Sequence, residues 1–166
     1  MIPPLPKGAR ERQRGMVSLE FALVFMLGVL PLLMLTVSGV LIFAAKQSLT
    51  LAASEGARAA LHYGTTAQRK TYACQSAQAA MQWLLTFSSE TTSCATPSAP
   101  GTTYMPVAVS SPSTCPSNSA MQCITVVASF DYNKHPFLPG TSAVYGWLLA
   151  ANLSSSATVQ IDLTGN

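Results

Sequence analysis

RGMVSLEFALVFMLGVLPLLMLTVSGVLIFAAK, residues 14–46, is the stretch that decides the architecture of this chain. No charged side chain stands between Glu20 and Lys46, and the apolar run 21–45 is 25 residues long. A bilayer core about 30 Å thick needs about 20 apolar helical residues. The run is therefore predicted to be a membrane-spanning helix rather than a buried core helix. A local loosening is expected at Pro31, which has no N–H to donate.

The charges are distributed unevenly around this run. Charged residues make up 9% of the 166 residues, against about a quarter in soluble domains. Residues 1–15 hold four basic residues and one acidic residue, whereas five basic and five acidic residues balance after them, so the net charge of +3 precedes the apolar run. The positive-inside rule then places residues 1–15 in the cytoplasm and the chain from Lys46 onward in the periplasm. No basic face is left on the exported part to bind nucleic acid.

A cleaved secretory signal peptide is the alternative to a permanent anchor. The apolar core of a signal peptide is about 7–15 residues long and is followed by small residues of the A-x-A type. Here the run is longer, and Phe43 precedes Ala44 and Ala45. Both features favour an anchor that stays in the inner membrane.

The four cysteines all follow the apolar run and indicate an oxidising compartment. They include no C-x-x-C pair of the kind that zinc sites use. An even number in an exported domain favours two disulfides, for which three pairings are possible. We expect the sequence-local pairing, Cys74–Cys94 with Cys115–Cys123, and peptide mapping distinguishes it from a pairing that contains Cys74–Cys123.

Two helices are predicted from residues at three- and four-residue steps. The first continues from the apolar run to about Leu61, and its small side chains allow a neighbouring element to approach closely. Gly64 ends this helix, and Thr65 or Thr66 is expected to cap a second helix over residues 67–87. The two stripes are Leu49, Ala52, Ala53, Gly56, Ala57 and Ala60, then Ala73, Ala77, Ala80, Leu84 and Phe87.

The rest of the chain is predicted to supply a small sheet. Residues 88–122, rich in serine, threonine and proline, are expected to form an irregular surface segment with a short strand near 104–109. Alternating apolar residues predict strands at 123–132 and 157–163, with a short helix or turn over 144–153 between them. The two strands are expected to pair antiparallel and to cover the helical stripe. The predicted fold class is α+β: a long N-terminal helix, membrane-spanning in its first half, packed on a small antiparallel sheet.

The order of these features resembles that of a type IV prepilin. A basic leader, Gly15, the sequence MVSLEF, an apolar helix and a small exported domain follow one another. More narrowly, SLEFALVFMLGVLPLLML (18–35) and AASEGARAAL (52–61) resemble the TadE-like minor pilins or pseudopilins of tight-adherence (Tad, type IVc) pilus systems. The resemblance covers residues 14–61, and loosely residues 123–163.

This resemblance implies a pilin-like fold with three parts. A cytoplasmic leader peptide would comprise residues 1–15, and the N-terminal helix would comprise residues 16–62 with its transmembrane segment at 21–45. Residues 63–166 would form the exported α+β domain. The implied partners are a prepilin peptidase, other pilin or pseudopilin subunits, the pilus assembly platform and the inner membrane.

The resemblance also gives roles to four residues. A prepilin peptidase would cut between Gly15 and Met16, so that Glu20 becomes the fifth residue of the mature chain, followed by Phe21. Glycine has no side chain to obstruct a peptidase, although a flexible joint is an alternative reason for it. Cleavage gives Met16 an α-amine one helical turn from Glu20. Glu20 can pair with the amine of its own chain or with that of a neighbouring subunit, and the family implies the second. The alternative is a glutamate that only reaches the aqueous boundary.

An enzyme is the less favoured class of function. The two histidines, His62 and His135, lie near no nucleophile motif, and the sequence has no G-x-S-x-G, H-E-x-x-H or phosphate-binding glycine loop. We expect no catalytic activity, no cofactor and no metal site. An unprocessed, membrane-anchored adhesin or binding domain is the alternative function, and cleavage after Gly15 discriminates between the two.

Overall fold

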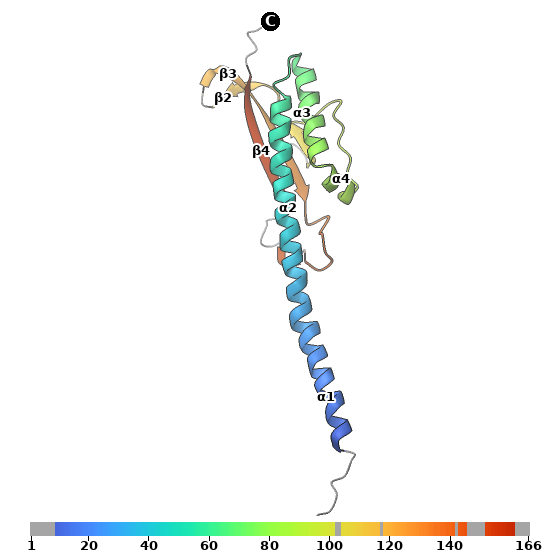
Figure 1. Ribbon diagram of the computed structural model, residues 1–166. Helices are drawn as coiled ribbons and strands as arrows, with labels where there is room; N and C mark the ends of the chain where they lie inside the picture. Colours follow the sequence, from blue (N-terminus) through green and yellow to red (C-terminus); the bar gives the residue numbers. More distant parts are fainter. Residues whose placement is uncertain (1–8, 102–103, 117, 142, 146–151, 162–166) are drawn as a thin grey trace, which may run out of the picture. The chain divides into compact units, whose positions relative to one another are not determined.

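The chain divides into two compact units, Met1–Val40 and Leu41–Asn166. The first unit is helical. The second holds helices and one antiparallel sheet, so the predicted α+β class is confirmed (Figure 1). The computed structural model describes residues 9–101, 104–116, 118–141, 143–145 and 152–161.

The first unit consists of α1 (Ala9–Val24), a π-helical turn η1 (Phe25–Val29) and the beginning of α2 (Leu30–Ala59). Helix α1 begins inside the expected leader, because residues 9–14 are mostly good helix formers such as Ala, Arg, Glu and Gln. The helix is thus already formed on the N-terminal side of the expected cleavage point between Gly15 and Met16.

The loosening expected at Pro31 takes the form of the π-helical turn. The Leu30 N–H donates to the Phe25 carbonyl, five residues back along the chain, which is the hydrogen-bond register of a π-helix. Proline has no N–H for the carbonyl four residues before it, and its ring crowds that carbonyl. A wider turn just before Pro31 relieves this conflict without ending the helix.

The second unit begins with the C-terminal part of α2, which packs through small side chains. Gly56 lies where an added Cβ would be 2.9 Å from the Ala73 carbonyl oxygen and 2.9 Å from Val126 Cγ1. The expected stripe is buried throughout: Leu49, Ala52, Ala53, Gly56, Ala57 and Ala60. Small residues here let α2 approach both α3 (Thr66–Ala80) and the sheet.

Helix α3 begins with a capping box. The Gln68 N–H donates to Thr65 Oγ1, and the Thr65 N–H donates to Gln68 Oε1 at 2.9 Å. Of the two caps that the sequence allowed, Thr65 is the one that the structure uses, since it keeps an extended backbone outside the helix.

The second predicted helix is interrupted, which the sequence did not indicate. It ends at Ala80 and resumes as α4 (Gln82–Ser88) after Met81. The Ala80 carbonyl accepts a hydrogen bond from Ser48 Oγ on α2, at 3.3 Å, while the Leu84 N–H donates to Met81 instead. The break turns Phe87 away from the predicted stripe, so that its ring is half exposed, although Ala73, Ala77 and Leu84 are buried as expected.

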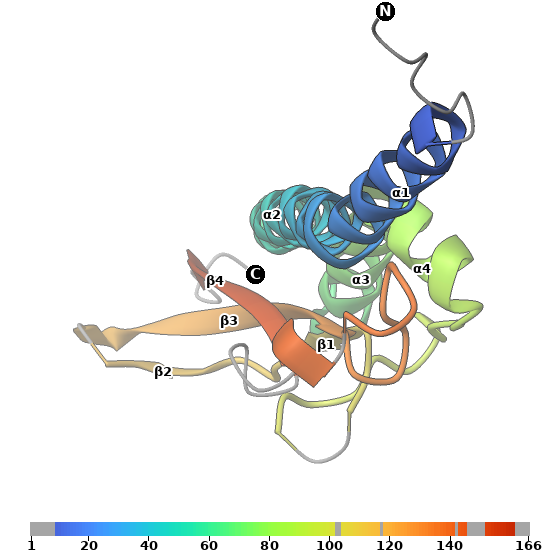
Figure 2. The same ribbon diagram turned by 90° about the horizontal axis from the view of Figure 1, so that it is seen from below.

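The sheet is built around one long strand, β3 (Asn118–Asp131). Strand β4 (Asn152–Ile161) pairs antiparallel along one side of it, from Gln122↔Ile161 to Asp131↔Asn152. Strands β1 (Val107–Val109) and β2 (Ser113–Cys115) pair antiparallel along the other side. The helices of this unit lie on one face of the sheet (Figure 2), and the antiparallel pairing of the two predicted strands is confirmed.

Several boundaries differ from those predicted. Strand β3 starts five residues earlier than residue 123, and β4 starts at Asn152 rather than at residue 157. Residues 143–145 form a helical turn, while 146–151 and 162–163 lie outside the described residues. The segment 88–122 is less irregular than expected, because it contains β1, β2 and the start of β3. Strand β2 has too little apolar alternation to be read from sequence, and its pairing with β3 forms it.

Two disulfides hold the serine- and proline-rich segment to the rest of the unit. Cys74 on α3 is joined to Cys94, and Cys115 on β2 is joined to Cys123 on β3. Both are the sequence-local pairs. The core between helices and sheet contains Leu49, Met81, Leu84, Ile124, Val126, Phe130 and Tyr132, each almost wholly buried.

Candidate functional site in the N-terminal helix

The predicted processing residues lie within one continuous helix. Gly15, Met16 and Glu20 are all in α1, so the Gly15–Met16 bond is in helical backbone. Met16 and Glu20 are four residues apart, which places them about one turn apart on the same face. Phe21 follows, and its ring stacks on Phe25 with centroids 6.4 Å apart.

The surface of this helix is apolar and uncovered. Every Met, Val, Leu and Phe side chain from Met16 to Met34 is exposed, with Met16 at 74% and Phe21 at 72%. The helix Met16–Ala59 is long and apolar enough to cross a membrane by its length and composition. A soluble protein rarely exposes a contiguous apolar surface of this size. The segment therefore fits a membrane anchor.

The block AASEGARAAL (52–61) differs from the exposed apolar part of the helix, because its small residues are packed against other elements. Its alanines and Gly56 face α3 and the sheet, as described above. Glu55 and Arg58 lie on the exposed side and form an ion pair of 3.2 Å, as their spacing suggests. Such a surface pair contributes little to stability. The motif is therefore explained by close packing rather than by chemistry.

A partly buried polar cluster joins the chain after α4 to the end of β3, and sequence reasoning missed it. The Glu90 carboxylate is only 16% exposed and lies 3.7 Å from Lys134 Nζ and 3.6 Å from His135 Nε2. The Asp131 N–H donates to Tyr104 Oη at 2.8 Å. Burial, and then the charge of Glu90, raise the pKa of Tyr104 well above its ordinary value. Residues so far apart in sequence carry no shared spacing that would have revealed the cluster.

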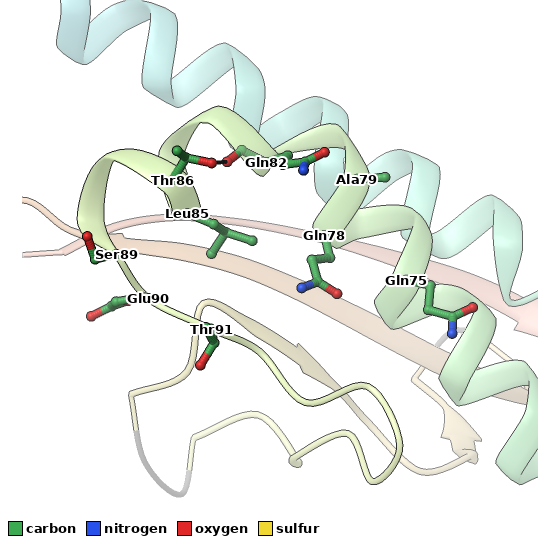
Figure 3. Close-up of a pocket in the computed structure, with 9 residues that line it drawn as sticks. All are labelled: Gln75, Gln78, Ala79, Gln82, Leu85, Thr86, Ser89, Glu90 and Thr91. Atoms are coloured by element: carbon green, nitrogen blue, oxygen red, sulfur yellow. Dashed lines mark hydrogen bonds between the residues drawn. The ribbon is translucent and has the colours of Figure 1, made fainter.

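A polar hollow of about 480 Å³ opens beside this cluster (Figure 3). Glutamines of α3 and α4 line it together with the chain that follows α4, and the Thr86 hydroxyl donates to the Gln82 carbonyl at 2.9 Å. Glu90 is the one ionisable side chain among its lining residues, so the hollow pairs no nucleophile with a base. The lining residues are Gln75, Gln78, Ala79, Gln82, Leu85, Thr86, Ser89, Glu90 and Thr91.

An exposed apolar helix followed by a disulfide-containing α+β unit fits the class of proteins that carry an N-terminal membrane anchor. Residues 15–58 match the family model described as TadE-like protein. Residues 15–58 are thus similar to the TadE-like family, and the resemblance read from this part of the sequence is confirmed. No curated protein and no solved structure matches it. The family match ends inside α2, so it does not extend to the sheet.

Proposed function

We propose that this protein is a minor pilin or pseudopilin that a prepilin peptidase processes and that takes part in Tad pilus assembly, initiation or adhesion. It would be anchored in the inner membrane by residues 21–45, with its N-terminus in the cytoplasm and residues from Lys46 onward in the periplasm. Its role would be structural rather than catalytic. The observation that carries the proposal is the position of Gly15, Met16 and Glu20 in α1, where the exposed apolar part of the helix begins.

Glycine suits the proposed cleavage for two physical reasons. It has no side chain to obstruct the approach of a protease to the backbone. It also weakens the helix locally, since glycine disfavours a helix by about 1 kcal/mol relative to alanine. The scissile bond lies in helical backbone, and a weak point there lowers the cost of opening it for cleavage.

Glu20 suits the proposed assembly step. A carboxylate at the edge of the hydrocarbon region needs a partner or water. Removal of residues 1–15 takes away the basic leader and creates an amine on Met16, one turn from Glu20. Charge pairing between Glu20 and the amine of a neighbouring subunit would then satisfy both groups as the exposed helices pack together.

Processing is tested by coexpression with a prepilin peptidase. Wild-type protein is expected to lose residues 1–15, and Gly15→Leu is expected to keep them, as measured by intact mass. Val17→Leu, two residues further on, is the matched control and should be cut normally. A wild-type chain that keeps Met1 beside an active peptidase would contradict the proposal.

The role of Glu20 is tested separately from processing. Glu20→Ala is expected to insert into the membrane and to be cut, but to be lost from purified pili. Ser18→Ala, on the same turn, should be recovered with the pili as the wild type is. Recovery of Glu20→Ala at the wild-type level would remove the assembly role from this residue.

A further inference from the structure

Among the strands in the described residues, β3 is the one that pairs with β4, so the other side of β4 faces no described strand. The Ser110 N–H donates to the Thr125 carbonyl, and the Ser129 N–H donates to the Pro106 carbonyl, so these β3 residues face β1. Along an antiparallel strand, the backbone N–H and carbonyl groups of successive residues point alternately to the two neighbouring strands. Val126 and Ala128, which lie between Thr125 and Ser129, therefore bond to β4.

The same alternation identifies which β4 groups point outward. Ala157 and Ser155 are the partners of Val126 and Ala128, so they bond to β3. Ser154, Ser156 and Thr158 must then direct their N–H and carbonyl groups away from β3. An independent contact agrees with this, because Lys46 Nζ donates to the Ser154 carbonyl at 2.8 Å.

Among the described residues, the backbone groups of Ser156 and Thr158 have no hydrogen-bond partner. Strand β4 is ten residues long and contains neither a charged residue nor a proline. Natural sheets usually protect such an edge with charges, prolines, bulges or a covering segment.

The opposite side of the sheet shows that protection. The Val109 N–H of β1 donates to the Ser98 carbonyl at 2.9 Å, so a loop covers that edge. Strand β2 is three residues long, its register shifts between Thr114 and Cys115, and a disulfide holds it to β3. Two of the three outer strands are thus closed to pairing, and the longest one is not.

The side chains beside the open edge also lack a cover. On the helix-facing side of β3, Ile124, Val126 and Ala128 are fully buried. The corresponding side chains of β4, Ala157 and Val159, are only partly buried against the same core. A further strand beside β4 would complete their burial.

We propose that the outer edge of β4 binds an extended segment of a neighbouring pilus subunit, which adds to the sheet as a fifth strand. This rests on the proposed function for the identity of the partner. Alternating donors and acceptors recognise an extended backbone, whatever its sequence. The segment should be uncharged, as β4 is, and should place apolar side chains beside Ala157 and Val159.

The test compares two substitutions at Ser156 in the full chain. Ser156→Pro removes the outward N–H, while the ladder to β3 uses the residues on either side, and prolines are tolerated at such edge positions. Ser156→Ala removes the exposed hydroxyl and keeps the N–H. Recovery of the protein with purified pili should fall at least tenfold for Ser156→Pro and stay at the wild-type level for Ser156→Ala.

The outcomes separate this proposal from the proposed function. Equal recovery of both variants with pili overturns the fifth strand and leaves the pilus role intact. If the wild type and both variants are absent from pili, the pilus role is overturned. A pilus subunit is then also excluded as the partner of β4. If Ser156→Pro does not fold, hydrogen exchange of the backbone amides in the wild-type protein provides the test instead. The amides of Ser156 and Thr158 should exchange fast in detergent and slowly in pili, and fast exchange in both states overturns the proposal.

Discussion

Replacement of Gly56 by alanine tests whether close packing explains the SEGARAA block. In an isolated helix this change would stabilise by about 1 kcal/mol, because glycine is the poorer helix former. In this fold the new Cβ would lie 2.9 Å from the Ala73 carbonyl oxygen, 2.9 Å from Val126 Cγ1 and 3.0 Å from Ala77 Cβ. Carbon atoms in contact prefer about 3.5–4.0 Å. The substitution therefore forces neighbouring elements apart.

The expected size follows from where those three atoms lie. Two belong to α3 and one to β3, so a shift of a single element cannot relieve all of them. Overpacking of a core costs about 1–3 kcal/mol, and we place this site at about 2–3 because one contact is backbone. Subtraction of the gain in helix preference leaves a net loss of about 1–2 kcal/mol. For a folded unit of this size the loss corresponds to a fall in Tm of about 3–10 °C.

The assay is thermal unfolding of the full chain in detergent, followed by circular dichroism. Gly28→Ala is the matched control, since a Cβ there would meet no heavy atom within 4 Å. The control should leave the Tm unchanged or slightly higher. A Tm for Gly56→Ala at or above the wild-type value would refute the packing argument, because helix preference alone predicts that result.

Three further predictions concern the second unit, Leu41–Asn166. Thr65→Ala should destabilise it by about 1 kcal/mol in urea unfolding through loss of the capping box, while Thr66→Ala should have a smaller effect; equal effects would contradict the role of the box. Replacing Cys74 and Cys94 together by serine should lower the free energy of unfolding by about 3 kcal/mol, because that disulfide closes a loop with a sequence separation of 20. Replacing Cys115 and Cys123 together should lower it by about 2.5 kcal/mol, because the separation there is 8. A larger loss for the shorter loop would count against chain entropy as the cause. The raised pKa of Tyr104 means that the folded state holds its proton more tightly, so stability should be fully present below about pH 10 and fall as the pH rises above it. In Tyr104→Phe the loss of stability at high pH should be smaller. A loss equal to that of the wild type would show that other groups cause it.

Local patterns in the sequence predict the helices of this protein well, because each depends on neighbours along the chain. The apolar run, the Thr65 cap and the buried stripe around Gly56 all follow from spacing and residue type. The break at Met81 does not, since it depends on a hydroxyl from Ser48 on another helix. A helix boundary set by tertiary contacts leaves no local signal.

The sheet shows the same limit more strongly. The sequence predicts β3 where apolar residues alternate, but residues 118–122 and β2 show no such alternation. They are strands because they pair, and a disulfide between Cys115 and Cys123 holds them in that pairing. The contacts around Glu90 likewise join residues that are distant in sequence.

The proposed functional residues also differ in whether the sequence alone can predict them. Gly15, Met16 and Glu20 are predicted from the sequence, because their order before an apolar helix is a linear signal, and their roles stay a prediction although the family match spans their positions. The open edge of β4 has no such signal, since its exposure depends on which strands lie beside it.

The N-terminal residue of the protein recovered from purified pili tests the account most directly. Peptide mass spectrometry of that material should find a chain that begins at Met16, with no peptide from residues 1–15. A chain in the pili that begins at Met1, or that carries any part of residues 1–15, would contradict processing as the step that prepares this protein for assembly.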